Sequence, residues 1–104
     1  MGKTSGVFIG NGSLLIGCAE AYLEAGHSIH CVVTGNADIA RWASGKNISV
    51  VDSNPESAIA IPPVSFDYLF SVANLRVLPP SLLSRASKLA INFHDGPLPR
   101  YAGL

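Results

Sequence analysis

Residues 7–22 read VFIGNGSLLIGCAEAY, and this stretch decides the fold class. The apolar run Val7–Ile9 stops at a turn formed by residues 10–13, which is typical of a strand that ends in a tight loop. Apolar side chains then recur at i, i+3, i+4 and i+7, the spacing of one helix face: Leu15, Cys18, Ala19 and Tyr22. Ser13 stands where a side-chain oxygen can cap this helix, and Gly26 stands where helices commonly end. We therefore expect a strand, a glycine turn and a helix in immediate succession.

The alternation of strand and helix continues along the chain. Apolar or β-branched runs predict further strands at 29–33, 48–51, 68–72 and 88–93, and helical patterns lie at 38–46 and 79–86. This succession predicts an α/β fold, a Rossmann-like three-layer parallel sheet with helices on both faces and strand order 3-2-1-4-5. Such sheets bind ligands at the carboxyl ends of their strands, where residues 10–13, 73–78 and 92–101 are expected to gather.

The second predicted helix shows which face enters the core. Ile39, Trp42 and Ala43 share one side of the segment 38–46 and are expected to be core residues. Asp38 and Arg41 fall outside that side, so we expect them to be surface charges.

Composition limits the classes of function. The chain has 104 residues, enough for one domain (1–104), with 48% apolar and only 13% charged residues. Seven basic and seven acidic residues cancel, which argues against binding nucleic acid. No apolar run approaches the ~20 residues of a membrane span. With two cysteines and no visible signal peptide, we expect a reducing, cytoplasmic location.

The glycine turn fails the two common nucleotide-binding patterns. A dinucleotide fingerprint needs a third glycine where Leu15 stands, and a phosphate-binding loop needs a lysine where Cys18 stands. NAD and ATP are therefore disfavoured. Four residues either bind a phosphate or another polar part of a substrate through their backbone amides, or simply form a tight turn: Gly10, Asn11, Gly12 and Ser13.

No metal site is expected. Four side chains are of types that bind zinc: Cys18, His27, His30 and Cys31. Their spacing, however, matches no zinc-finger pattern. Because side chains alternate along a strand, His30 and Cys31 are expected to point to opposite faces and cannot easily share an ion.

The last predicted strand ends in two polar side chains. Asn92 and His94 are separated by one residue, so both are expected on the same side of the strand, at the carboxyl end of the sheet. An amide can donate a hydrogen bond to a developing oxyanion, and an imidazole can take a proton from an attacking amine. The pair therefore suits acyl-type transfer to nitrogen.

Here the chain resembles the 10-formyltetrahydrofolate-dependent formyltransferases. Residues 91–94 and 97–103 (INFH and PLPRYAG) resemble that family's N-x-H…LLPxYxG signature. Upstream, residues 66–72 resemble the family's "PDLIVVVA" strand, and residues 77–79 resemble its "ILP" loop. Residues 25–27 match its common "AGH", and residues 10–13 resemble the corresponding loop of the glycinamide ribonucleotide branch. The likeness extends over essentially the whole chain and is most specific over residues 66–104.

The resemblance implies a reaction and a set of site residues. Asn92 and His94 correspond to two of the family's three catalytic residues. A formyl group would pass from 10-formyltetrahydrofolate, a co-substrate, to a primary amine of a small-molecule or carrier-bound acceptor. The folate would lie against the backbone of Asn74, Leu75, Arg76, Val77 and Leu78, unless this segment is a plain connection. Asp95 replaces the family's proline or small residue, and it either binds the substrate amine or makes the turn.

The family's catalytic aspartate has no counterpart before Leu104. We therefore expect the N-terminal portion of a formyltransferase domain, truncated after the fifth strand, inactive alone and missing the C-terminal part of its domain. Mean hydropathy is high at +0.34, and residues 88–93 would leave an apolar sheet edge, so we expect a tendency to dimerise through that edge. The alternative is a non-catalytic, formyltransferase-like docking module. The identity of the acceptor stays open.

Overall fold

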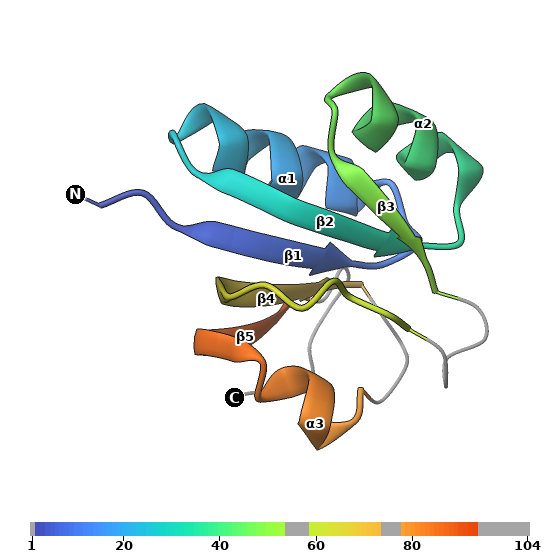
Figure 1. Cartoon of the computed structure of the whole chain (residues 1–104). Helices are drawn as coiled ribbons and strands as arrows, with labels where there is room; N and C mark the ends of the chain where they lie inside the picture. Colours follow the sequence, from blue (N-terminus) through green and yellow to red (C-terminus); the bar gives the residue numbers. More distant parts are fainter. Residues whose placement is uncertain (1, 54–58, 74–77, 94–104) are drawn as a thin grey trace, which may run out of the picture.

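The computed structural model describes residues 2–53, 59–73 and 78–93. Five parallel strands form one sheet in the order β3-β2-β1-β4-β5 (Figure 1). The strands are β1 (Ser5–Ile9), β2 (Ser28–Thr34), β3 (Ser49–Asp52), β4 (Phe66–Val72) and β5 (Ala86–Phe93). The helices are α1 (Leu14–Glu24), α2 (Ala37–Gly45) and α3 (Pro80–Leu83). The predicted fold class and strand order are confirmed.

Helices lie on both faces of the sheet. α1 and α2 cover one face over β1, β2 and β3, and α3 lies on the other face near β4 and β5 (Figure 1). The core is accordingly split into two clusters by the sheet. The cluster on the α1–α2 side contains Phe8, Leu15, Ala19, Val32, Ile39, Ala43, Phe70 and Val72. The cluster on the α3 side contains Val7, Ile9, Cys31, Val33, Ile61, Phe66, Leu69, Leu78 and Leu82.

α1 ends as predicted but begins differently. Gly26 has a φ of 97°, its amide donates to the Leu23 carbonyl, and the amide of the following residue, His27, donates to the Tyr22 carbonyl. This pair of bonds is the Schellman arrangement, which needs a residue that tolerates positive φ. At the other end, the Ser13 side chain makes no capping hydrogen bond because Ser13 itself has helical dihedral angles. The predicted Ser13 cap is therefore wrong.

α2 carries the side-chain cap that α1 lacks. The Asn36 side-chain oxygen accepts hydrogen bonds from the amides of Asp38 and Ile39. Ile39 and Ala43 are buried, as predicted, while Trp42 is half-buried and its indole N–H donates to a Glu20 carboxylate oxygen over 3.0 Å. Asp38 and Arg41 form an exposed ion pair, consistent with surface charges.

The third helix is shorter than predicted. α3 covers only Pro80–Leu83, whereas the sequence suggested a helix over 79–86. The chain has to be extended from Ala86 onward because Ala86 pairs with Phe66 at the start of β4. Pairing with the sheet therefore ends the helix before its sequence pattern does.

A β-bulge changes the direction of side chains in β2. Successive residues of β1 pair with Ile29 and Cys31, so His30 is the extra residue of the bulge. The His30 ring stacks on Phe66 with centroids 6.3 Å apart, and Phe66 belongs to the same core cluster as Cys31. The expectation that His30 and Cys31 point to opposite faces is therefore wrong.

β5 is the edge strand next to β4. Within the described sheet it pairs with β4 alone, and two of its apolar side chains stay exposed, Leu89 by 56% and Phe93 by 39%. The predicted apolar edge over residues 88–93 is thus present. Parallel strands are usually buried on both faces, so an exposed one is unusual.

Candidate functional site

The carboxyl ends of the strands meet at one edge of the sheet, where the sequence predicted a ligand site. Of the predicted segments, residues 10–13, 73, 78 and 92–93 are described. The predicted site residues Asn74, Leu75, Arg76, Val77, His94 and Asp95 lie outside the described residues. The site is therefore built from what β1, β4, β5 and α3 contribute.

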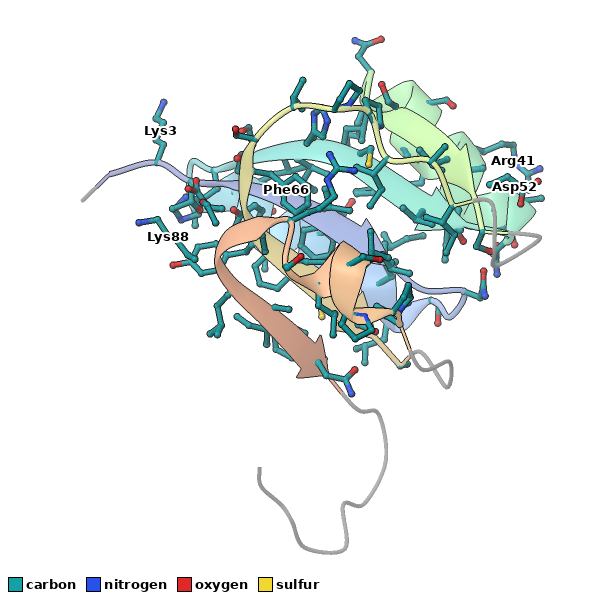
Figure 2. All side chains as sticks on the ribbon, turned by 60° about the horizontal axis from the view of Figure 1, so that its bottom comes forward. Lys3, Arg41, Asp52, Phe66 and Lys88 are labelled. Atoms are coloured by element: carbon teal, nitrogen blue, oxygen red, sulfur yellow. The ribbon has the colours of Figure 1, made fainter. Side chains whose placement is uncertain are left out.

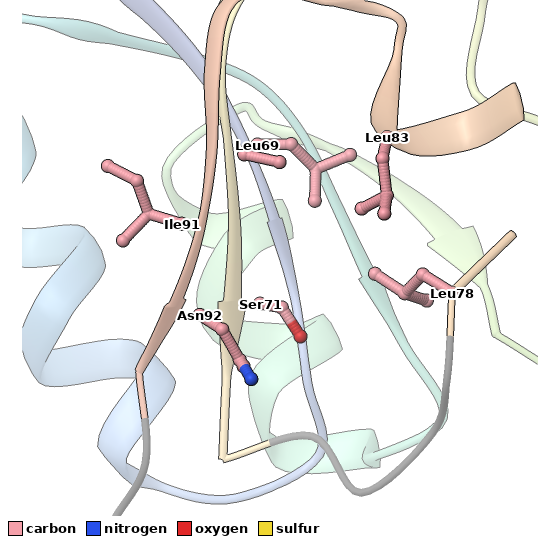
Figure 3. A pocket seen from close by; sticks show the side chains of 7 residues that line it. Leu69, Ser71, Leu78, Leu83, Ile91 and Asn92 are labelled. Atoms are coloured by element: carbon pink, nitrogen blue, oxygen red, sulfur yellow. The ribbon is translucent and has the colours of Figure 1, made fainter. Parts of the chain in front are cut away.

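A cavity of about 340 Å³ lies between the β4–β5 pair and α3 (Figure 3). It is lined by Leu69, Ser71, Leu78, Leu83, Ala90, Ile91 and Asn92. Its volume falls at the lower end of the range found for small-molecule sites, ~300–1,000 Å³. The mixture of apolar walls with a few polar groups is also typical of such sites.

Asn92 and Ser71 are the polar side chains among the described residues that line this cavity. They are register partners on the parallel strands β5 and β4, so their side chains project from the same face of the sheet. Figure 3 shows the two side chains next to each other at the carboxyl end, with Leu78 on the α3 side. Two predicted site residues, Asn92 and Leu78, therefore line one cavity.

Leucine side chains form the walls around that polar pair. Leu69 projects from β4 into the α3-side cluster, and Leu78 and Leu83 lie across the cavity from the sheet (Figure 3). Such surroundings lower the local dielectric constant and strengthen any hydrogen bond made inside. A polar atom of a ligand would therefore interact most strongly at the Ser71–Asn92 end.

The backbone is strained where β4 leaves the sheet at this edge. Ala73 has a φ of 50°, a left-handed conformation that a residue other than glycine rarely adopts. Its amide donates to the Phe93 carbonyl over 2.7 Å, which extends the β4–β5 contact beyond the last strand residues. Strained backbone of this kind is found preferentially at functional sites.

Gly10 is required by close packing at the same edge. A Cβ atom on Gly10 would lie 2.4 Å from the Val72 carbonyl oxygen, which is too close for any side chain. Only glycine, which has no Cβ atom, fits at this position. β1 and β4 approach each other here, so the tight-turn interpretation accounts for Gly10 without a ligand.

Asn11 joins the first two loops of the fold. Its side-chain oxygen accepts hydrogen bonds from the Thr34 hydroxyl over 3.1 Å and from the Gly35 amide over 2.7 Å. Its backbone carbonyl accepts a third from the Asn36 side chain over 2.8 Å. The carboxamide oxygen of Asn11 is therefore used inside the protein.

Gly12 and Ser13 are the more open half of the glycine turn. A Cβ atom on Gly12 would meet nothing within 4 Å, and the Ser13 side chain makes no capping bond. The first turn of α1 contains no acidic residue, so no carboxylate of that turn opposes a negative ligand group there. Both interpretations of these two residues stay open.

A second cavity, of about 330 Å³, lies at the carboxyl ends of β2 and β3. Its walls come from Thr34, Gly35, Asn36, Ala37, Ala40, Val50 and Asp52. The Thr34 hydroxyl and both ends of the Asn36 side chain are engaged in hydrogen bonds within the protein. None of the site residues predicted from the sequence is among the described residues that line this cavity, so the candidate site is placed at Asn92.

Charged groups are sparse around the sheet. Figure 2 shows Lys3 and Lys88 near the amino ends of the strands and Asp52 near the opposite edge.

Burial raises the pKa of the Cys31 thiol to about 11, against a smaller lowering effect of Arg85. Within the ranges that the structure describes, no three His, Cys, Asp or Glu side chains gather closely enough to hold a metal ion.

Ser71 is the site residue that sequence reasoning missed. Ser71 is a polar residue that stands between two apolar residues, Phe70 and Val72, near the end of β4. A single polar residue at the carboxyl end of a buried strand was the signal that could have revealed it.

No family model matches the sequence, and no solved structure matches the chain. None of the helices in the described part of the chain has the length and apolarity needed to span a membrane.

Proposed function

We propose that this chain contributes to an enzyme that transfers a formyl group from 10-formyltetrahydrofolate to a primary amine of an acceptor. The observation that carries the proposal is the position of Asn92. Its side chain lines a ligand-sized cavity at the carboxyl end of a parallel sheet, in a chain whose residues 91–94 and 97–103 resemble the formyltransferase signature.

The chemistry assigned to each group follows from the reaction. The acceptor nitrogen forms a bond to the formyl carbon, and the formyl oxygen gains negative charge in the tetrahedral intermediate. The Asn92 amide donates a hydrogen bond to that oxygen. The bond from carbon to the folate nitrogen then breaks, the acceptor amine loses one proton, and the folate nitrogen gains one. His94 assists this proton transfer.

The co-substrate is proposed to lie against residues 74–78. Leu78 is the described member of that segment, and it is buried in the wall of the cavity that contains Asn92. A planar ring needs an apolar surface and a short reach to Asn92, and this position offers both. The size of the cavity is consistent with one part of such a ligand rather than with all of it.

The acceptor is proposed to be a small-molecule or carrier-bound amine in the cytoplasm. The balanced net charge argues against nucleic acid as the acceptor, because nucleic-acid proteins are commonly strongly basic. Gly12 and Ser13 at the start of α1 are the part of the glycine turn best suited to a polar group of the acceptor. Asp95 is a further candidate for the acceptor amine.

Replacement of Asn92 tests the proposal. In the full-length protein, Asn92→Ala should lower kcat for formyl transfer by about 100- to 1,000-fold, because one donor to the oxyanion is lost. Asn47→Gly is the matched control, since it removes an exposed carboxamide at a φ of 61°, which glycine also adopts.

Two outcomes would contradict the proposal. One is that the unaltered full-length protein transfers no formyl group to any primary amine tested. The other is that Asn92→Ala keeps its activity while remaining folded by circular dichroism. The first result would favour the non-catalytic docking module, for which the exposed apolar side chains of β5 are the supporting observation. The second would show that Asn92 does not stabilise the oxyanion and would remove the observation on which the proposal rests.

A further inference from the structure

Ser71 is a buried polar side chain that faces the cavity. It is 7% exposed, and what exposure it has is toward the cavity that it lines. Among the residues that the structure describes, none forms a side-chain hydrogen bond with the Ser71 hydroxyl. Because the side chain opens onto the cavity, its hydroxyl can be reached by a ligand bound there.

The spacing between Ser71 and Asn92 suits a shared ligand atom. The two residues are directly paired on adjacent strands, and neighbouring strands lie about 4.8 Å apart. The two side chains lie next to each other at the carboxyl end (Figure 3), so an oxygen placed between them can accept a hydrogen bond from each, from two different directions, over about 2.9 Å. Carbonyl lone pairs point in two such directions.

The lining of the cavity restricts what Ser71 can do. Its described lining residues are, apart from Ser71 and Asn92, all apolar. No histidine or carboxylate is among them, so no described neighbour can activate the hydroxyl as a nucleophile. A hydrogen bond to the ligand, in which Ser71 keeps its proton, is the chemistry left to it.

We propose that Ser71 is a further catalytic residue, whose hydroxyl donates to the same formyl oxygen as the Asn92 amide. This inference rests on the proposed function. The Asn92 carboxamide has two N–H donors and an acceptor oxygen, so it can hold one contact inside the protein and still bind the ligand. Two donors aimed at one oxygen in apolar surroundings stabilise negative charge that grows in the transition state.

The test compares three serine variants of the full-length protein. Ser71→Ala should lower kcat by about 100-fold with little change in KM, because the lost bond strengthens in the transition state. Ser71→Thr keeps the hydroxyl and should retain most of the activity. Ser49→Ala, the matched control, removes an exposed hydroxyl from β3 at the other edge of the sheet and should leave kcat unchanged.

An infrared measurement gives a second readout that does not depend on turnover. A stable 10-formyl folate analogue, labelled with ¹³C at the formyl carbon, should show a lower carbonyl stretching frequency on the unaltered protein than on Ser71→Ala. A second hydrogen bond to the oxygen weakens the C=O bond, so the frequency on Ser71→Thr should stay low. Thermal unfolding of each variant checks that the fold is kept.

The outcomes separate this inference from the proposed function. If Asn92→Ala loses activity while Ser71→Ala keeps it and its carbonyl frequency, the role of Ser71 is refuted and the formyl transfer stands. If the unaltered protein transfers no formyl group, the proposed function fails and the role of Ser71 fails with it. Loss in both variants with retention in Ser71→Thr supports both.

Discussion

At the scale of the single residue, Cys31 shows most clearly what burial does to chemistry. Its side chain is fully buried in β2, and burial raises its pKa from 9.0 to about 11. The folded protein therefore keeps the thiol proton in a pH range where the unfolded chain has lost it. The stabilisation is complete below pH 9 and is lost as the pH rises toward 11.

We predict a corresponding loss of stability in alkali. The free energy of unfolding should fall by about 2–3 kcal/mol between pH 9 and pH 11 through Cys31 alone, as the size of the pKa change implies. Urea unfolding across that range measures it. Cys31→Ala should show a shallower pH dependence than the unaltered protein; an unchanged slope would disprove the assignment.

At the scale of the element, Arg85 connects the segment before β4 to the turn between α3 and β5. Its guanidinium donates to the carbonyls of Ile61 over 2.9 Å and Pro62 over 2.7 Å. It also lies over the Phe66 ring, 5.6 Å from the centroid. These contacts join the chain before β4 to the turn before β5.

Removing the guanidinium should destabilise the fold. Arg85→Met keeps much of the apolar stem but leaves two carbonyls without their charged donor, so we expect a loss of about 2–3 kcal/mol. Arg41→Met is the control, because the Asp38–Arg41 pair is exposed and should contribute less than about 1 kcal/mol. Chemical denaturation measures both, and equal losses would contradict the role of Arg85.

At the scale of the whole molecule, the two long edges of the sheet differ. β3 ends the sheet on one side and β5 on the other. Val50 on β3 is 37% exposed, compared with 56% for Leu89 on β5. An apolar strand with an unpaired edge is a template for pairing with another strand.

We predict that the chain self-associates through β5. Sedimentation velocity over a range of concentrations should show a monomer–dimer equilibrium that Leu89→Lys shifts toward monomer, because a lysine blocks edge pairing. Val50→Lys, on the opposite edge, should leave the equilibrium unchanged. A monomer at every concentration, or equal effects of both lysines, would rule out pairing through β5.

Local sequence patterns were enough to predict the order of the elements and the strand order of the sheet. Apolar runs, helical spacing and glycine stops act over a few residues, and the handedness of crossovers restricts how parallel strands can be joined. The same reasoning correctly placed the end of α1 at Gly26, the Ile39–Ala43 face in the core and the apolar edge at β5.

What the tertiary structure decided depends on pairing between distant residues. α3 stops early because Ala86 must pair with Phe66, and β2 bulges at His30 to stay in register with β1. Asn92 could be chosen from the sequence because it stands near the end of a strand, whereas for Ser71 the sequence shows only a polar residue near the end of another strand. Its position beside Asn92 is set by the register between β4 and β5, and a one-residue slip would have turned it to the other face.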